Sequence, residues 1–320
     1  MFFSWYKKFS SQPHQPFFTS GILFLILFMS LFVSVYSNFL VLDNSVLTYH
    51  AYTMVFVIFI QFFLGFLFVV FPRFLIQAEI QIQEYMKQFL LYFFASLGIF
   101  LTLIFYSKVT FIFQILMLIA QIMSFKLLYS IHKKSIVKVK EDTKWVLISL
   151  FSGLVFHSLF IISSLNFPYA YELSRFAIDG GFYLFLFMVI FVISQRMIPF
   201  FTTAKAPNYV ANKSVNLLTI IFSLLAFKVI LLAFDNAKLN LLADIPLFIM
   251  ITRELIKWKL PFFKSPAIMW VLFLGLYWIP VAFFMSIIEG LMAFYNPSII
   301  FEKAVINTMA LGYFLTVFIC

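Results

Sequence analysis

Ionisable side chains inside long apolar runs are the residues of this chain that could do chemistry. His50 begins one such run, Asp179 lies near the start of another, and Glu289 ends a third. Asn307 lies near the start of the last one. A charged group in lipid costs on the order of several kcal/mol unless it is paired or faces a polar cavity. Each of these residues therefore marks a candidate functional site.

His157 lies deep in an apolar run. It follows the start of that run by twelve residues, which corresponds to about 18 Å of helix. Two readings are open: a neutral imidazole bonded to a serine or a carbonyl, and a ligand of haem or a metal ion. His50 and His157 differ by about 10 Å in expected depth, so one haem held by both requires a tilted or shifted helix.

Lys228 and two arginines are the notable cations. Lys228 lies in the middle of an apolar run, where it pairs with an acidic group or a carbonyl, or carries protons or substrate. Arg73 and Arg196 close two runs as FPRF and QRMIPFF. They serve as topological anchors, or they bind an anionic headgroup or a haem propionate.

The sequence lacks the common motifs of catalytic sites. The sequence has no glycine-rich phosphate loop, no HExxH, no nucleophile elbow and no zinc-type ligand spacing. These motifs carry phosphate binding, metal-assisted hydrolysis and acyl transfer. We therefore expect a protein that does not turn over substrate in the usual way.

Apolar helices must position these residues. We expect an all-α protein, a polytopic transmembrane helix bundle with about ten spans. We expect it to form a single integral-membrane domain, residues 1–320. The expected spans are 17–40, 51–71, 89–107, 109–131, 145–165, 176–198, 215–234, 239–251, 267–288 and 304–320. The eighth is short and contains Pro246, which favours a kink or a tilt.

Positive charge alternates between the connecting segments. Of the 22 Lys and Arg residues, 2, 2, 6, 3 and 4 lie in the N-terminus, 72–88, 126–144, 195–214 and 252–266. Because Lys and Arg favour cytoplasmic loops, the N-terminus is predicted to be cytoplasmic. His50, Asp179, Glu289 and Asn307 would then share one layer near the outer surface. The polar stretch 132–144 is predicted to be a cytoplasmic linker.

Composition excludes other classes of protein. Hydrophobic residues make up 64% of the chain and the mean hydropathy is +1.06, which excludes a water-soluble domain. The net charge of +10 lies beside span ends, so the expected partner is anionic membrane lipid and not nucleic acid. The lone Cys320 excludes an internal disulfide. It also ends the chain within an apolar run, and we expect the chain to be shortened relative to its relatives.

Five segments occur in an order that resembles the NnrS family. They are QPHQPFF, YHAYTM, FPRF, QRMIPFFT and ALGYFLT. The resemblance implies a multi-pass protein of the bacterial inner (cytoplasmic) membrane that acts in the nitric oxide response and contains haem and copper. It also implies nitric oxide, or a metal-nitrosyl species derived from it, as a partner.

The same resemblance implies ligands, and the sequence departs from it in places. His50 and Met54 match the family's second-helix motif, but Tyr52 stands at its second histidine and Asn307 at the histidine of the final motif. The implied haem b ligands are then drawn from His14, His50 and His157, with Arg73 and Arg196 as propionate contacts. Copper would be held by His50 and Met54. One imidazole without a thiolate binds copper weakly, so haem is the more expected cofactor.

Three hypotheses follow. The leading one is an NnrS-like protein that protects against nitric oxide through a haem or metal site. The second is a secondary transporter of a small solute or protons that uses Asp179, Glu289 and Lys228, with Asn307 on the pathway. The third is a shortened copy without activity.

Overall fold

Helices make up all the regular structure that is described. The computed structural model describes residues 2–42, 45–165, 167–205, 208–296 and 301–319. The expected all-α class is confirmed. The chain divides into two compact units, Met1–Leu186 and Phe187–Cys320, and each is described by itself. The expectation of a single domain stays a prediction, and Cys320 at the end of the tenth expected span lies outside the described residues.

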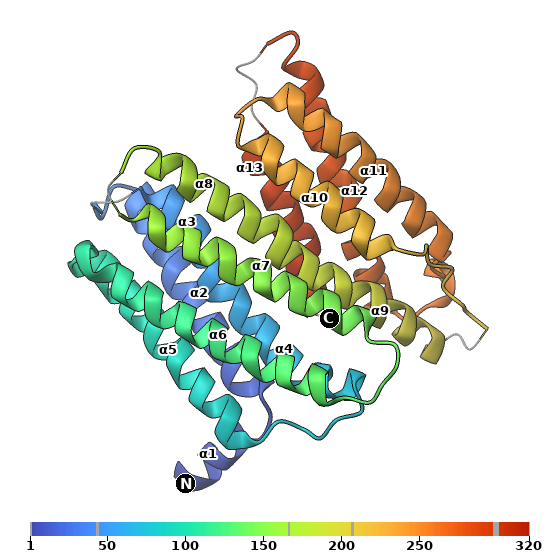
Figure 1. Ribbon diagram of the computed structural model, residues 1–320, viewed down its shortest axis with the longest axis horizontal. Helices are drawn as coiled ribbons and strands as arrows, with labels where there is room; N and C mark the ends of the chain where they lie inside the picture. Colours follow the sequence, from blue (N-terminus) through green and yellow to red (C-terminus); the bar gives the residue numbers. More distant parts are fainter. Residues whose placement is uncertain (1, 43–44, 166, 206–207, 297–300, 320) are drawn as a thin grey trace. The chain divides into compact units, whose positions relative to one another are not determined.

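Unit 1 is a bundle of long helices (Figure 1). Its helices α5 and α6 form a hairpin through η2, α7 packs on α6 and α8, and α2 packs on α4 and α5. The elements are α1 (Phe2–Phe9), α2 (His14–Tyr36), α3 (Val46–Thr53), η1 (Met54–Ile58), α4 (Phe59–Phe74), α5 (Ile82–Phe105), η2 (Ser107–Val109), α6 (Thr110–Lys134), α7 (Glu141–Ser163), α8 (Ala170–Gly180) and η3 (Gly181–Phe187), which crosses the unit boundary.

Unit 2 is built around helix α12, which packs on α11, on η5 and on α9. Helix α10 packs on α11. The elements are α9 (Met188–Lys205), α10 (Leu217–Leu232), α11 (Ala237–Trp258), η4 (Phe262–Lys264), α12 (Ala267–Met292), α13 (Glu302–Asn307), η5 (Thr308–Leu315) and α14 (Thr316–Ile319).

Seven described helices are long and apolar enough to cross a membrane. They are His14–Tyr36, Val46–Phe74, Ile82–Phe105, Ser107–Lys134, Glu141–Ser163, Ala170–Lys205 and Ala267–Met292. Leu217–Leu232 and Ala304–Leu315 are apolar but shorter. The chain is therefore a membrane protein of several spans, and the predicted count of about ten is not confirmed.

Two expected boundaries differ from the structure. The eighth span was expected over 239–251, whereas α11 runs unbroken over 22 residues with Pro246 inside it. The helix continues because neighbours pack along its length and offset the one lost backbone hydrogen bond. The stretch 132–144 is mostly helical, with only 135–140 between α6 and α7. Lys140 closes this link by donating to the carbonyls of His132 and Ser135.

The segments predicted to be cytoplasmic meet at one end within each unit. In unit 1, Tyr85 donates to the carbonyl of Ser10, and Ser135 donates to the carbonyl of Leu75 at 3.0 Å. In unit 2, the carboxylate of Glu254 accepts a hydrogen bond from the backbone N–H of Ser214 at 2.9 Å. Within each unit, a long helix separates the loops at its two ends, so the remaining loops lie at the far ends of the helices from these segments. The grouping agrees with the charge alternation, and the side of the membrane stays a prediction.

Among the described residues, three stretches wind as π-helix, and each begins just after a residue singled out by sequence. η1 follows Tyr52, η3 follows Asp179 and η5 follows Asn307 by one or two residues. π-Helical turns are rare and occur often at functional sites. Just before η3, at the end of α8, the backbone lies close to α7, since a Cβ on Gly180 would lie 2.1 Å from the ring of Phe156.

The predicted orientation can be tested with single cysteines in a background where Cys320 is changed to serine. Val139, in the link between α6 and α7, is 79% exposed. Tyr106 follows the C-terminal end of α5, on the predicted outer side, and is 57% exposed. We expect a membrane-impermeant maleimide on intact cells to label Tyr106→Cys and to label Val139→Cys only after permeabilisation. Labelling of Val139→Cys in intact cells would show that the link between α6 and α7 faces outward and would contradict the predicted orientation.

Candidate functional site

His157 is the centre of a buried polar network in unit 1. Its ring and the ring of Tyr52 are fully buried. The Nε2 atom of His157 lies 3.0 Å from the Tyr52 hydroxyl, and its Nδ1 atom lies 2.8 Å from Oε1 of Gln121. Gln121 in turn donates from Nε2 to the carbonyl of Phe56 at 3.1 Å. Helices α3, α6 and α7 and the π-turn η1 thus meet at one set of hydrogen bonds.

The direction of each hydrogen bond follows from the Phe56 carbonyl, which is the last acceptor of this network. The Phe56 carbonyl can only accept, so the amide NH2 of Gln121 faces it and Oε1 faces His157. Nδ1 of His157 therefore carries the proton, and in the neutral ring Nε2 is a bare acceptor. The Tyr52 hydroxyl donates to it. Every polar atom of the imidazole is thereby satisfied.

Aromatic rings enclose this centre. The Phe56 ring stacks on His157 with centroids 4.8 Å apart, and the Phe160 ring stacks on Tyr52 at 4.4 Å. Such stacked rings exclude water and hold the polar rings in place. The hydrogen bonds are consequently in a dry environment of low dielectric, where they are strong.

His50 faces the other side of its helix. Residues two apart on a helix point about 200° apart, so Tyr52 faces His157 while His50 contacts Phe32 of α2 at 4.4 Å between ring centroids. Nδ1 of His50 is buried without a protein partner among the described residues. It borders a cavity of about 20 Å³ lined also by Tyr49 and Thr53, which is room for about one water.

The residues of unit 1 do not fit a haem held by His50 and His157. The body of α3 lies between the two rings, and both nitrogens of His157 are already bonded. Pockets for ligands smaller than a porphyrin measure about 300 Å³ or more, far above the cavity beside His50. His14 is exposed and lies eighteen residues, about 27 Å along α2, from the Phe32 that contacts His50.

A copper site has few ligands here. His50 and the half-buried Met54 are one helical turn apart, which lets their side chains approach. Within the described parts of the chain, no three His, Cys, Asp or Glu side chains lie close enough to hold a metal ion. One imidazole and one thioether form an incomplete set for copper.

The remaining predicted residues lie in both units. Asp179 is buried in unit 1, and Glu289 is buried in unit 2, whereas Asn307 of unit 2 is exposed. Arg73 is exposed and pairs with Glu79 at 3.1 Å, and Arg196 is half-buried. The structure does not test the shared outer layer or the propionate role, so both stay predictions.

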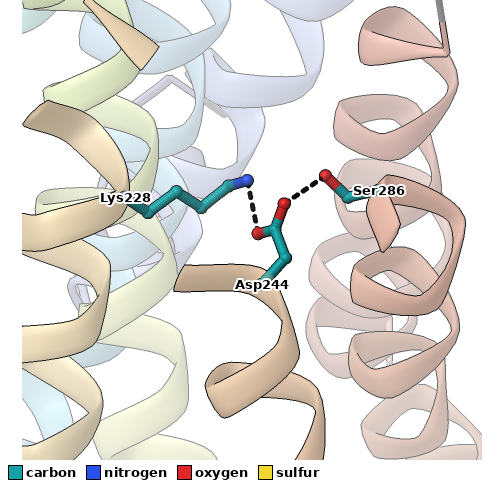
Figure 2. A network of polar contacts seen from close by, with 3 residues as sticks. All are labelled: Lys228, Asp244 and Ser286. Carbon is teal, nitrogen blue, oxygen red and sulfur yellow. Dashed lines mark hydrogen bonds and ion pairs between the residues drawn. The ribbon is translucent and has the colours of Figure 1, made fainter. Parts of the chain in front are cut away.

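A buried ion pair lies in unit 2 (Figure 2). Nζ of Lys228 lies 2.5 Å from Oδ1 of Asp244, and the hydroxyl of Ser286 donates to Oδ2 at 2.6 Å. All three side chains are buried. They come from α10, α11 and α12, so one carboxylate links three helices. Lys228 thus has an acidic partner, and the role of carrying protons or substrate stays a prediction.

The side chains of Asp244, Ser286 and Gln121 take part in these networks but were not predicted as site residues. Asp244 stands two residues before Pro246 in the sequence LLADIPLF, and an acidic residue inside an apolar run opposite Lys228 was the available signal. Gln121 lies inside an apolar run, where a glutamine most often forms a hydrogen bond between helices. Its contact with His157 depends on the spacing of α6 and α7, which no sequence pattern gives.

Comparison with known proteins identifies one family. The family model described as NnrS protein matches residues 8–320 of the chain. Searches of curated proteins and of solved structures found no match. The match covers both units.

The ion pair of unit 2 predicts a large effect of removing one partner. Lys228→Met leaves the Asp244 carboxylate buried without its cation, and we expect the free energy of unfolding to fall by about 3 kcal/mol or more. It would be measured by denaturant titration in detergent micelles.

Two further variants separate charge from packing. The double variant Lys228→Met/Asp244→Leu removes both charges and should regain most of the lost stability. The matched control Lys238→Met removes an exposed lysine and should change stability by less than about 0.5 kcal/mol. Equal losses in the single and double variants would contradict the interpretation.

Proposed function

We propose, since the chain belongs to the NnrS family, that it acts in the bacterial response to nitric oxide from within the cytoplasmic membrane. The observation that carries the proposal is the family match over residues 8–320. The apolar helices support a membrane location. Nitric oxide is small and uncharged, so it enters lipid and packed apolar helices, where ions do not.

The centre of the proposed function is the Tyr52–His157–Gln121 network. It is buried, hydrogen-bonded throughout and enclosed by phenylalanine rings. A neutral gas reaches such a centre through the bundle, whereas charged solutes are excluded by the cost of desolvation. Tyr52 occupies the position at which the family's motif has its second histidine, so this centre replaces an imidazole with a phenol.

We assign no step to haem or copper. A haem clamped by His50 and His157 is inconsistent with the geometry of unit 1, and His50 with Met54 makes an incomplete copper set. The proposal therefore rests on the side chains of the chain itself. His50 keeps a buried ring nitrogen that has no partner within the part of the protein that the structure describes, which makes it the residue to examine if a metal is found.

A second candidate function is transport of protons or a small solute through unit 2. The buried Lys228–Asp244 pair favours it, because paired ionisable groups inside membrane helices often mark ion or proton pathways. Glu289 in the same unit, and Asp179 in unit 1, are the other acidic groups buried in apolar helices that this reading uses. Proton-coupled uptake into proteoliposomes that Asp244→Asn abolishes would favour transport over the nitric oxide role.

The proposed function predicts protection of a host cell. In a bacterium that lacks its own nitric oxide defences, expression of the chain should shorten the growth lag after addition of a nitric oxide donor. Tyr52→Phe and His157→Gln should each lose most of this protection, and Tyr92→Phe, a buried tyrosine outside the network, should keep it. No difference between expressing and empty cells would refute the role.

Cofactor content gives a separate prediction. We expect the purified protein to show no stoichiometric Soret absorbance, and elemental analysis to show iron and copper well below one atom per chain. The physical reason is the absence of a paired histidine site in unit 1. One haem per chain that is lost in His50→Ala would overturn this expectation and restore the haem hypothesis.

A further inference from the structure

We propose that Tyr52 is a one-electron donor that passes its phenolic proton to His157, and that its oxidant is nitrogen dioxide. The pairing of this phenol with a base carries the proposal. The hydroxyl of Tyr52 lies 3.0 Å from Nε2 of His157, and both residues are fully buried.

Two other buried tyrosines show what is special about this contact. Tyr92 and Tyr313 are also fully buried, but their hydroxyls meet serine hydroxyls, Ser124 at 3.3 Å and Ser194 at 3.1 Å. A phenol that loses an electron becomes strongly acidic and must release its proton. A serine hydroxyl is a very poor proton acceptor, whereas an imidazole nitrogen accepts readily.

Gln121 prepares His157 for this role. Its Oε1 accepts from Nδ1–H at 2.8 Å, while the Phe56 carbonyl fixes the amide from the other side. The bare Nε2 therefore faces the Tyr52 hydroxyl. After proton transfer the ring is an imidazolium, and the Gln121 oxygen remains bonded to its Nδ1–H, which stabilises the positive charge. Gln121 is thus a positioning residue, and Tyr52 and His157 carry the reaction.

The environment selects the oxidant. Phe56 and Phe160 stack against the pair, so a charged oxidant would have to lose its hydration to reach it. Nitric oxide and oxygen are both apolar gases, and together they form nitrogen dioxide, a neutral one-electron oxidant. The choice of nitrogen dioxide as the oxidant rests on the proposed function, whereas the assignment of Tyr52 as an electron donor that passes its proton to His157 does not.

The step balances in atoms and charge. One electron passes from the Tyr52 phenol to nitrogen dioxide, which becomes nitrite, and the phenolic proton passes to Nε2 of His157. The products are a neutral tyrosyl radical, an imidazolium and nitrite. A second nitrogen dioxide can combine with the radical: a C–N bond forms at the ring, the ring proton moves to the phenolic oxygen, and 3-nitrotyrosine results.

This product provides the test. Purified full-length protein in lipid nanodiscs would be exposed to a nitric oxide donor in air-equilibrated buffer, and nitration at each tyrosine measured by peptide mass spectrometry. Tyr92 is the internal control because it is equally buried. We expect nitration of Tyr52 to exceed that of Tyr92 by about tenfold or more, which is within what a positioned base contributes.

Variants separate basicity from packing. His157→Gln keeps a hydrogen-bonding side chain but removes the base, and it should lower nitration of Tyr52 to the level of Tyr92. Gln121→Leu should give an intermediate level. Ser124→Ala, which changes the partner of Tyr92, should leave Tyr52 unaffected. An anionic oxidant such as hexachloroiridate should oxidise exposed tyrosines and spare Tyr52.

Equal nitration of Tyr52 and Tyr92 in the unmodified chain, or a preference that survives His157→Gln, would overturn the proposal. If His157→Gln fails to fold, the ratio in the unmodified chain and in Gln121→Leu decides the question. The measurement uses purified protein, so it is independent of growth protection. Selectivity without protection would refute the cellular role alone, and protection without selectivity would refute the electron donor alone.

Discussion

The absence of water around the apolar helices is the constraint on which the rest of this structure depends. A polar group in such surroundings must find its partner within the protein. In unit 1, the buried polar groups form hydrogen bonds from Tyr52 through His157 and Gln121 to the Phe56 carbonyl. In unit 2, Lys228 pairs with Asp244, which also accepts a hydrogen bond from Ser286. The first network joins α3 and η1 to α6 and α7, and the second joins the successive helices α10, α11 and α12. The polar groups thus help to specify which helices meet.

The π-turn at Met54–Ile58 connects backbone geometry to this chemistry. A π-turn widens the helix and changes which carbonyls are bonded within it. The Phe56 carbonyl in this turn accepts from Gln121, and that single bond determines the amide orientation, the imidazole tautomer and the direction of the Tyr52 hydroxyl. A local departure from α-helical winding thus sets the orientation of the Gln121 amide, the nitrogen of His157 that carries the proton, and the acceptor of the Tyr52 hydroxyl. The Phe56 ring, in the same turn, covers the imidazole.

Apolar run length was sufficient to predict the fold class, because it depends on composition over windows of about twenty residues. Charge alternation agrees with the contacts among the predicted cytoplasmic segments within each unit. The same reasoning gives less where packing decides. Pro246 was expected to favour a kink or a tilt in a short span, and the helix that contains it, α11, continues on both sides of it with neighbouring helices packed along its length. His157 was expected either to bond to a serine or a carbonyl or to bind haem or a metal ion. Its hydrogen-bond partners are instead Tyr52 and Gln121, 105 and 36 positions away. Asp244 lay inside the expected eighth span but was not singled out, because its pairing with Lys228 depends on how α10 packs on α11.

The two-residue spacing between His50 and Tyr52 has a consequence for the whole motif. On an α-helix this spacing directs one side chain towards α2 and the other towards α7. A relative that carries histidine at both positions would present its two imidazoles to two different neighbours, and no single ion could bind both without unwinding the helix. Such a motif would equip one short helix to serve two separate centres, and in this chain Tyr52 places a phenol at the second of these positions.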